Sequence, residues 1–508
     1  MSATAGDTRP SYHITPESNW LSDPQRPFFL GGEWHLYYLY NSDFDFTNPT
    51  GGGGTEWFHV TSQDMVSWVP QGVVIEKYQP RPDGVVLGDI ETGSAVIDTE
   101  NTAGFGENAV VAILTQMQDG IQQQSLFYSM DNGYSFTPYP GNPIMPNPDA
   151  AAKLAFRDPK VIWDATSNQW VMALSEATKI TFYTSTNLTT WSYESTFSPL
   201  DSGIDLGTLE CPDLYQLDVD GDTTKRTWVL ATSANGYLYN RATGTAYWTG
   251  AWDGSTFSAS DINPQWMDDG SDFYATVTWT DSRFTEDEMY AARYAIGWTN
   301  NWDYAKELPY YGGWAGQLSL VREIRLKTID GVVTMVGEPI SPYTNVFNTS
   351  SSANGTTITT DSTTASLPEM AGGAYVIHAV VSKNDDDDGD EVRIRIKGDG
   401  TYGTTLGYNF ITSQAFFRRD NDGVAADSMA TAPNEAYDAA RAGSVPLPAN
   451  TVTLSVYVDW NSAEAFVNDG GRTLSGLIYP NLGAETIEMV SGSGQLSLDS
   501  FTYAGISV

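Results

Sequence analysis

Three acidic residues stand at corresponding places in a pattern that recurs along this sequence. They are Asp23 in "LSDPQ", Asp158 in "FRDPK" and Glu210 in "LECPD". Each precedes a proline by one or two residues, at the entrance to a run of strand-forming residues. A single acid beside a proline is ordinarily turn chemistry. Its recurrence at three strand entrances favours a shared site in which three carboxyl groups meet.

Carboxyl groups gathered in one place push their pKa values apart, so that one stays ionised while another can donate a proton. Retaining cleavage of a glycosidic bond needs that division, with a nucleophile and an acid about 5–5.5 Å apart. A third acid could hold sugar hydroxyl groups as positive charge develops on the ring. Arg157, beside Asp158, can pair with a neighbouring acid and keep it ionised. The alternative interpretation is three turns at strand entrances.

The elements that must position these acids are strands, because helical periodicity is scarce and hydrophobic runs with polar turns recur. The predicted strands are "EWHLYYLYN" (33–41), "NAVVAILTQM" (108–117), "NQWVMALSEA" (168–177) and "RTWVLATSA" (226–234). Hairpin turns are expected at 31–32, 166–168 and 218–224. Recurring strand-hairpin-strand units predict a β-propeller, with a large sandwich as the alternative. In a propeller, the innermost strands start around one central funnel, so acids far apart in sequence converge.

The pattern changes near residue 340. The segment "NTSSSANGTTITTDSTTAS" (348–366) is rich in Ser and Thr and predicts an irregular connection. Alternating hydrophobic residues then resume in "YVIHAVVS", "EVRIRIKG" and "VTLSVYVDW". We therefore predict a propeller over 1–345, a connection over 346–366 and a smaller all-β domain, a β-sandwich, over 367–508.

The composition limits the classes of partner. Asp and Glu number 63 against 25 Lys and Arg, a net charge of −38. This argues against nucleic acid and anionic membranes, and it fits a neutral substrate such as a sugar, or simple solubility. No apolar run is long enough to span a bilayer. One cysteine and four histidines predict no disulfide within the chain, no metal site and no cofactor.

Two acidic stretches invite a calcium interpretation. Asp218, Asp220 and Asp222 match the first half of an EF-hand loop, but Thr223 stands in place of its glycine and Val229 in place of its bidentate glutamate. We expect a hairpin turn there. The run of four aspartates at 385–388 lies between two predicted strands, and we expect a solvated loop.

Several stretches together resemble glycoside hydrolase family 32, the family of invertases, inulinases and levanases. "NWLSDPQRP", "FRDP" and "ECPD" resemble its three signature motifs, and "EWFHVTSQDMVSW", "ETGSAVID" and "GWAGQLSLVREI" follow in the family's order. "DWNSAEAFVNDG" resembles part of its C-terminal domain. The resemblance implies an all-β fold, a five-bladed β-propeller followed by a C-terminal β-sandwich, and a retaining mechanism.

By this resemblance, Asp23 matches the nucleophile, Asp158 the transition-state stabiliser and Glu210 the acid/base. Cys211 matches a cysteine that follows the acid/base and would act only through its surroundings. The resemblance also places eight residues at the sugar pocket as substrate-binding candidates: Trp20, Ser22, Leu39, Trp57, Thr92, Gly93, Arg157 and Trp314.

The sequence also departs from the family's usual pattern. The first motif usually reads Trp-Met-Asn-Asp-Pro-Asn-Gly, whereas Ser22 precedes the nucleophile here and Gln25-Arg26 replace Asn-Gly. Leu39 stands where a Gln is usual, and Leu209 where a Trp is usual. Ser22 and Leu39 remove amide groups that would help to hold the nucleophile and a water molecule. A weaker water site favours transfer of the sugar to another hydroxyl group over hydrolysis.

Among family members that transfer, the pattern resembles bacterial levan fructotransferases, which implies levan (β-2,6-fructan) and fructo-oligosaccharides as partners and difructose dianhydride IV as the product. An exo-levanase that releases fructose, and a non-catalytic propeller that only binds fructan, are the alternatives. The start "MSATAGDTRP" fits either a mature secreted form or a cytoplasmic start. A secreted protein is expected, since levan is an extracellular polymer.

Overall fold

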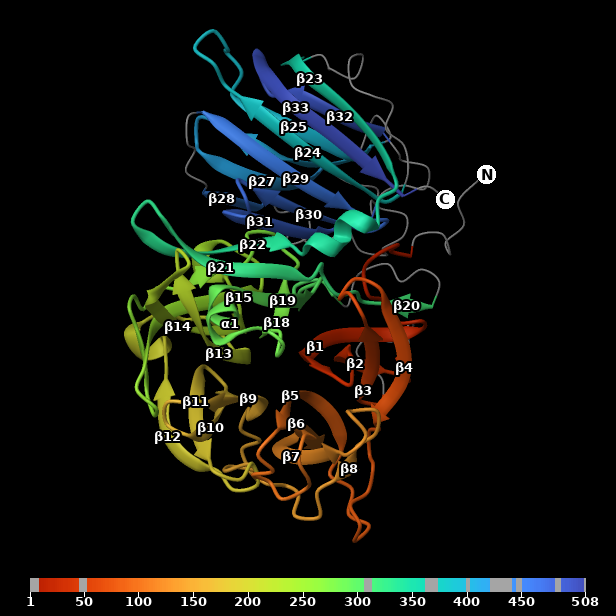
Figure 1. Ribbon diagram of the computed structural model, residues 1–508, viewed down its shortest axis with the longest axis vertical. Helices are drawn as coiled ribbons and strands as arrows, with labels where there is room; N and C mark the ends of the chain where they lie inside the picture. The colour runs from red at the N-terminus through yellow and green to blue at the C-terminus, as the bar shows by residue number, and fades with distance from the viewer. Residues whose placement is uncertain are drawn as a thin grey trace.

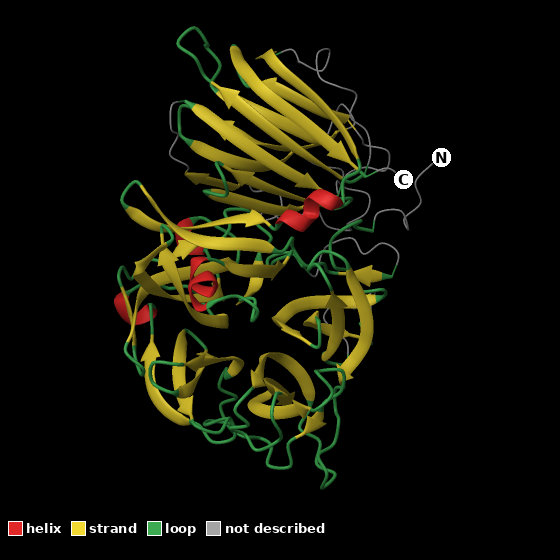
Figure 2. Cartoon of the chain, viewed as in Figure 1, coloured by secondary structure: helices red, strands yellow, loops and turns green. Residues whose placement is uncertain are grey.

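The computed structural model describes residues 9–44, 53–305, 313–360, 373–398, 403–420, 441–444, 450–479 and 486–506. Strands dominate both parts of the chain, and helices are few and short (Figure 2). The N-terminal part is a five-bladed propeller whose innermost strands surround one centre, and the C-terminal part is a sandwich that lies against one side of it (Figure 1). The predicted fold class is thus confirmed. No helix among the described residues is long and apolar enough to cross a membrane.

Each of the first three blades is an antiparallel sheet of four strands in chain order. Blade I contains β1 (Asn19–Leu30), β2 (Glu33–Asn41), β3 (Glu56–Ser62) and β4 (Trp68–Ile75). Blade II contains β5 (Asp89–Asp98), β6 (Ala109–Gln118), β7 (Ile121–Ser129) and β8 (Thr137–Pro138). Blade III contains β9 (Arg157–Asp164), β10 (Gln169–Glu176), β11 (Lys179–Ser185) and β12 (Ser192–Phe197).

The last two blades share one hydrogen-bonded sheet, because β13 pairs with β21. Blade IV contains β13 (Glu210–Val219), β14 (Asp222–Ala234), β15 (Gly244–Trp252), β16 (Phe257–Ala259) and the short β17 (Gln265–Trp266). Blade V contains β18 (Tyr274–Trp279), β19 (Arg293–Trp298), β21 (Arg322–Ile329) and β22 (Val332–Pro339). The short strand β20 (Trp314–Ala315) pairs in parallel with β1 and so joins the end of the propeller to its beginning.

The remaining elements of the propeller are single turns. They are α1 (Glu286–Ala291), η1 (Leu200–Ser202), η2 (Tyr237–Tyr239) and η3 (Ser341–Asn345). The hydrophobic core lies between neighbouring blades. Tyr37 and Trp57 of blade I pack with Leu114 of blade II, and Val111 of blade II packs in a cluster with Met172 of blade III. Apolar residues on both faces of each blade therefore hold the innermost strands in place.

The sandwich consists of two antiparallel sheets whose inner faces form one apolar core. One sheet contains β23 (Thr349–Thr359), β24 (Tyr375–Ser382), β29 (Thr451–Val458), β30 (Ser462–Val467), β31 (Arg472–Leu477) and β33 (Gln495–Gly505). The other contains β25 (Glu391–Gly398), β26 (Gly403–Asn409), β27 (Gln414–Asp420), β28 (Arg441–Ser444) and β32 (Thr486–Ser491).

The Ser/Thr-rich connection differs from the expectation. Residues 349–359 form the edge strand β23, which pairs along its length with β33. Thr has a high strand propensity, and Ile358 is buried in the sandwich core. A polar strand of this kind suits a sheet edge, so the segment belongs to the sandwich; residues 361–366 of the predicted connection lie outside the described residues.

The two acidic stretches are held by protein partners. Asp218 pairs with Arg226 and Asp220 accepts hydrogen bonds from Thr328, which makes this segment a hairpin turn. The run 385–388 lies in the loop between β24 and β25, as expected for a solvated loop.

Candidate active site

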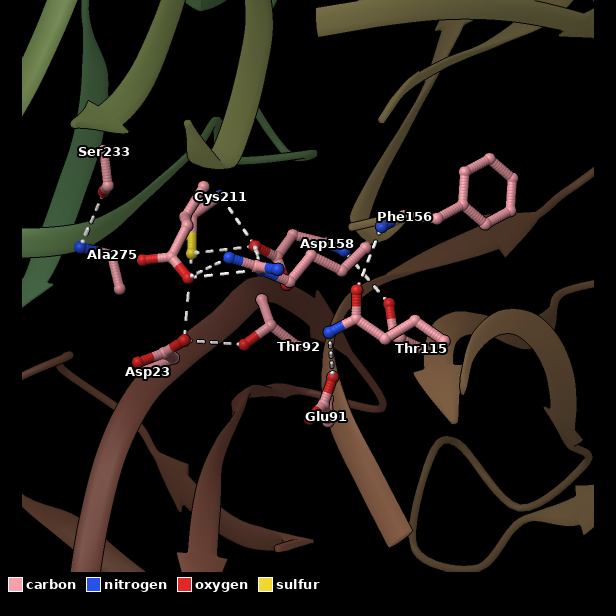
Figure 3. A network of polar contacts seen from close by, with 12 residues as sticks. Asp23, Glu91, Thr92, Thr115, Phe156, Asp158, Cys211, Ser233 and Ala275 are labelled. Carbon is pink, nitrogen blue, oxygen red and sulfur yellow. Dashed lines mark hydrogen bonds and ion pairs between the residues drawn. The ribbon is translucent and has the colours of Figure 1, made fainter. Parts of the chain in front are cut away.

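The three acids predicted from the sequence come together at the centre of the propeller. Asp23 lies on β1, Asp158 on β9 and Glu210 on β13, each near the start of the innermost strand of its blade. All three line one cavity of about 460 Å³, within the usual range of about 300–1,000 Å³ for small-molecule sites. Figure 3 shows Asp23 and Asp158 directed toward Cys211, which follows Glu210.

The same backbone irregularity occurs at Asp23 and Asp158 and directly after Glu210. In each blade, two residues of the innermost strand lie opposite one residue of the second strand, which is a β-bulge. The two residues of each bulge, in blade order, are Ser22–Asp23, Glu91–Thr92, Asp158–Pro159, Cys211–Pro212 and Ala275–Thr276. A bulge breaks the alternation of a strand and directs adjacent side chains toward the centre.

Asp23 sits among neutral donors. Thr92 Oγ1 donates a hydrogen bond to Asp23 Oδ2 over 2.7 Å, and Cys211 Sγ lies 3.8 Å from the same oxygen. Gln25 Nε2 donates to the Asp23 carbonyl oxygen over 3.0 Å. Burial and, secondarily, the charge of Glu210 raise the pKa of Asp23 to about 6, although the Thr92 hydrogen bond opposes the rise. At neutral pH Asp23 is an ionised, poorly solvated carboxylate, as a nucleophile must be.

Asp158 is held in an unusual backbone conformation. Its φ angle is 62°, in the left-handed region that Asp tolerates better than most residues. Its N–H donates to Thr115 Oγ1 over 3.0 Å, and its Oδ2 accepts from the Cys211 N–H over 3.0 Å. Burial raises the pKa of Asp158 to about 7, with Arg157 opposing the rise and Glu210 adding to it. Asp158 is thus fixed at the cavity wall rather than free to rotate.

Glu210 is held by one cation and one phenol. Arg157 donates from Nη2 and Nε to Glu210 Oε1 over 2.8 and 3.2 Å, and Tyr274 donates to Glu210 Oε2. Its side chain is 23% exposed, and that of Asp158 only 6%. Glu210 is therefore more exposed to solvent than Asp158, which suits an acid/base that must exchange protons.

Cys211 remains a neutral thiol between the acids. Its Sγ lies 3.8 Å from Asp23 and 3.9 Å from Asp158. Burial, together with the charges of Asp158 and Asp23, raises the pKa of the thiol well above its usual value. The thiol is thus a weak donor to one or the other carboxylate and not a nucleophile.

Most of the residues expected at the pocket line the cavity. Besides the three acids, the sequence-based candidates on its wall are Trp20, Ser22, Leu39, Thr92 and Arg157. Trp20 packs on Phe44 at 4.8 Å between ring centroids and on Trp298 at 5.8 Å, which makes one side of the cavity aromatic. Flat aromatic faces of this kind suit the apolar faces of sugar rings.

The other three candidates lie behind the cavity wall. Trp57 is fully buried between blades I and II, and its indole N–H donates to the Glu91 carbonyl oxygen. The Gly93 N–H donates to Gln25 Oε1 over 2.9 Å and so ties blade II to blade I. Trp314 is on β20, which pairs with the start of β1; Arg9 lies over its ring, and Trp314 does not line the cavity. These residues position the wall and do not form its surface.

The structure adds residues that the motifs did not single out. The further cavity-lining residues are Asn41, Phe44, Gly54, Thr55, Glu91, Met117, Gln122 and Trp302, and Tyr274 contacts Glu210. Glu91 begins the stretch "ETGSAVID" and lies in the bulge of β5, and Tyr274 lies next to the bulge of β18. A search for polar residues at the entrance of every innermost strand would have found both.

Among the described residues, no group of His, Cys, Asp and Glu side chains is arranged to hold a metal ion. The arrangement supplies a carboxylate among neutral donors, an acid held by an arginine, and a third carboxyl group fixed nearby. These are the groups that a retaining glycoside cleavage requires.

Comparison with known proteins agrees with this geometry. Residues 13–337 match the model of the N-terminal domain of glycosyl hydrolases family 32, and residues 343–504 match that of the C-terminal domain. The levanbiose-producing levanase of Bacillus subtilis is 38% identical over 98% of this chain and 90% of its own length. An extracellular exo-inulinase of Aspergillus niger is 31% identical over 96% of this chain and 92% of its own.

The same resemblance holds in three dimensions. The crystal structure of exo-inulinase from Aspergillus awamori superposes with a TM-score of 0.84 at 28% identity, covering 98% of each chain. The family models together match nearly the whole chain. The chain belongs to glycoside hydrolase family 32.

Proposed function

We propose that this protein is a levan fructotransferase, which removes two fructosyl units from the end of a β-2,6-fructan and closes them into difructose dianhydride IV. The acids of the cavity support glycosidic cleavage with retention. The name of the Bacillus subtilis relative, a levanbiose-producing levanase, supports levan as the substrate and a cavity that accepts a disaccharide unit.

The cavity wall next to the nucleophile is the observation that supports transfer to a sugar hydroxyl group rather than to water. Ser22 and Asp23 form the bulge of β1, and Leu39 of β2 lies opposite them. All three residues line the cavity. A bound water needs two to four polar partners, and the leucine side chain offers none. This wall therefore favours attack by a sugar hydroxyl group that is held by the rest of its ring.

The reaction begins at C2 of the second fructosyl unit from the chain end. Asp23 attacks this carbon, the bond from C2 to O6 of the third unit breaks, and Glu210 gives its proton to that oxygen. The result is a difructosyl–enzyme ester and a shortened levan. The 6-hydroxyl group of the terminal unit then attacks the same C2, Asp23 leaves as a carboxylate, and Glu210 accepts the hydroxyl proton.

Asp158 and Arg157 support both steps. Asp158, fixed by its own N–H and by that of Cys211, is placed to bind ring hydroxyl groups as positive charge develops at C2. Arg157 holds Glu210 and lies 3.8 Å from Asp158 Oδ2. Two displacements at one carbon retain the configuration, and the cyclic product contains one water less than levanbiose.

The first experiment identifies the products from levan by mass spectrometry and NMR. We expect the dianhydride as the main product of the native protein. The double variant S22N/L39Q restores two amide groups beside Asp23 and is expected to shift the products toward the linear disaccharide or fructose. E210Q is the control for cleavage itself and is expected to lower kcat by about 10²–10⁴.

The outcomes separate the alternatives. Free fructose as the main product of the native protein means an exo-levanase, and linear levanbiose means hydrolytic release of disaccharides; either result contradicts the role given to Leu39. Unchanged turnover in E210Q contradicts the catalytic assignment of Glu210, whereas binding of levan without any turnover by the native protein favours the fructan-binding alternative. We also place the protein outside the cell, as the polymer substrate requires and the name of the Aspergillus niger relative supports.

A further inference from the structure

Glu91 is a fourth acidic residue of the cavity, and the cleavage chemistry does not use it. It is the third residue of β5, in the bulge that it forms with Thr92. Its side chain lines the cavity together with Gln122 and Met117. Figure 3 shows Glu91 and Asp23 on opposite sides of Thr92. A sugar ring bound over Asp23 would thus have Glu91 beside it, toward a neighbouring ring.

Neutral groups hold both the side-chain carboxyl group and the backbone carbonyl group of Glu91. Gln122 Nε2 donates to Glu91 Oε2 over 3.3 Å, and Gln122 Oε1 accepts from the Phe156 N–H over 2.9 Å. Because the Phe156 N–H can only donate, the amide must present its NH₂ group to Glu91. The Trp57 indole holds the Glu91 carbonyl oxygen over 3.0 Å. The carboxyl group is therefore held in one orientation, with its other oxygen left for a ligand.

An ion pair does not account for this residue. Within the described parts of the chain, no Lys, Arg or His side chain forms a salt bridge with Glu91. Arg157, which lies on the neighbouring blade, pairs with Glu210 instead. A carboxyl group in a cavity wall without a cation costs free energy, and such groups are concentrated at functional sites.

We propose that Glu91 is a specificity-determining residue that binds a hydroxyl group of the fructosyl unit next to the one attacked by Asp23. This inference rests on the proposed function, in which two fructosyl units occupy the cavity together. It gives the second unit a fixed partner, which holds that unit while its 6-hydroxyl group attacks.

The surroundings keep Glu91 protonated at neutral pH. Burial, then the carboxylates of Asp89 and Asp158, raise the pKa of Glu91 to about 8; Arg157 opposes the rise and Glu210 adds to it. Oε2 accepts from Gln122, so the proton resides on the other oxygen. A protonated carboxyl group can donate to a hydroxyl oxygen, and an ionised one cannot. Binding through this donor should therefore weaken as the pH rises through about 8.

The test measures binding without turnover. Levantriose is titrated calorimetrically into D23N and into D23N/E91Q between pH 6 and 9.5. D23N removes both cleavage and the titration of Asp23, while Asp158 titrates alike in both proteins. We expect affinity for D23N to fall about tenfold through pH 8, the loss of one good hydrogen bond. The amide that E91Q introduces keeps a donor at every pH, so D23N/E91Q should lack this step.

A second substitution tests what causes the fall in affinity near pH 8. D23N/D89N removes the carboxylate that most raises the pKa of Glu91 and should move the step to lower pH. Identical pH profiles in D23N and D23N/E91Q overturn the proposal. If the affinity of D23N does not change with pH and the native protein still makes the dianhydride, only the role of Glu91 is overturned. A step that depends on Glu91, with fructose as the product, supports sugar binding by Glu91 and overturns only the cyclisation.

Discussion

At the scale of single residues, Asp23 and Glu210 have different chemical roles because their hydrogen-bond partners differ. Asp23 has neutral donors, Thr92 and Cys211, while Glu210 has Arg157 and Tyr274. A carboxylate with few donors in a buried place is reactive toward carbon, and one beside a guanidinium and solvent can exchange protons. The assignment of nucleophile and acid/base follows from these contacts as well as from the motifs.

Replacing Thr92 by Val should shift the acidic limb of the pH profile of kcat/KM to higher pH. The substitution removes the hydrogen bond to Asp23 Oδ2, so the carboxylate is less stabilised and its pKa rises above about 6. Because attack requires ionised Asp23, kcat/KM is lost as the pH falls through this pKa. Hydrogen bonds to charged groups contribute about 1.5–3 kcal/mol, so the limb should rise by about 1–2 pH units. The measurement is the pH profile of kcat/KM.

A matched control is T181V. Thr181 is also buried, on β11 of blade III, and its hydroxyl group has no hydrogen-bond partner within the described part of the chain. The same change there should leave the acidic limb in place. A limb that stays near its native position in T92V would show that Thr92 does not set the ionisation of Asp23.

At the scale of elements, hydrogen bonds between blades hold the bulges in register. The N–H of Asp158 donates to Thr115 of blade II, that of Cys211 to Asp158 of blade III, and that of Ala275 to Ser233 of blade IV. These three bulge residues all have positive φ angles. A strained backbone of this kind persists only when its surroundings fix it, and here each blade fixes the next.

Replacing Gly93 by Ala should disturb this arrangement. A Cβ atom at Gly93 would overlap the carbonyl oxygen of Ile113 and the backbone of Leu114 on β6. Because backbone cannot move aside cheaply, we expect a loss of about 1–3 kcal/mol in the free energy of unfolding. We also expect lower kcat, since Thr92 precedes the displaced residue. Denaturant unfolding and initial rates measure the two effects.

G244A on β15 is the control for this substitution. The nearest atom to its Cβ is a ring carbon of Trp266 at 3.6 Å, an ordinary contact. It should keep native activity and stability or gain slightly, since alanine restricts the unfolded chain. If G93A resembled G244A, the close approach of β5 and β6 would not matter for the site.

At the scale of the whole molecule, a buried polar network joins the propeller to the sandwich. Arg322 of β21 pairs with Asp268 over 2.8 Å and with Glu464 of β30 over 2.6 Å, and all three side chains are at most 2% exposed. His13 lies between Glu464 and Asp459, at 3.1 and 2.8 Å. Charges desolvated to this degree require their partners. The two parts should therefore unfold together.

Replacing Arg322 by Met should destabilise the entire molecule. Two buried carboxylates lose their cation, which typically costs about 3–5 kcal/mol. Thermal unfolding should show one transition at a lower Tm. The double variant R322M/E464Q removes one of the stranded charges and should lose less than the sum of the two single variants.

R325M is the control on the same strand. Arg325 is 43% exposed and pairs with Glu323 at the surface, where such pairs contribute about 0–1 kcal/mol. We expect little change in its Tm. Separate transitions for the propeller and the sandwich in R322M would contradict a single cooperative unit.

The sequence by itself determined the fold class and the three acids. Hydrophobic runs with hairpin turns predicted four strands of the propeller, which correspond to β2, β6, β10 and β14, and 33–41 coincides with β2. The motifs around Asp23, Asp158 and Glu210 predicted the residues that meet at the centre. These features are local, since strand periodicity and the residues flanking each acid lie within a few positions of one another.

Only the tertiary structure decided which other residues surround the acids. Glu91 lies in the bulge of β5 and Tyr274 next to the bulge of β18. A polar residue at a strand entrance can be found in the sequence, but the bulge that brings it to the centre depends on pairing with the second strand. Trp57 and Gly93 lie in matching motifs yet stand behind the wall. Pairing between distant strands also made an edge strand of 349–359. Positions of this kind depend on contacts between segments far apart in the chain, which periodicity cannot encode.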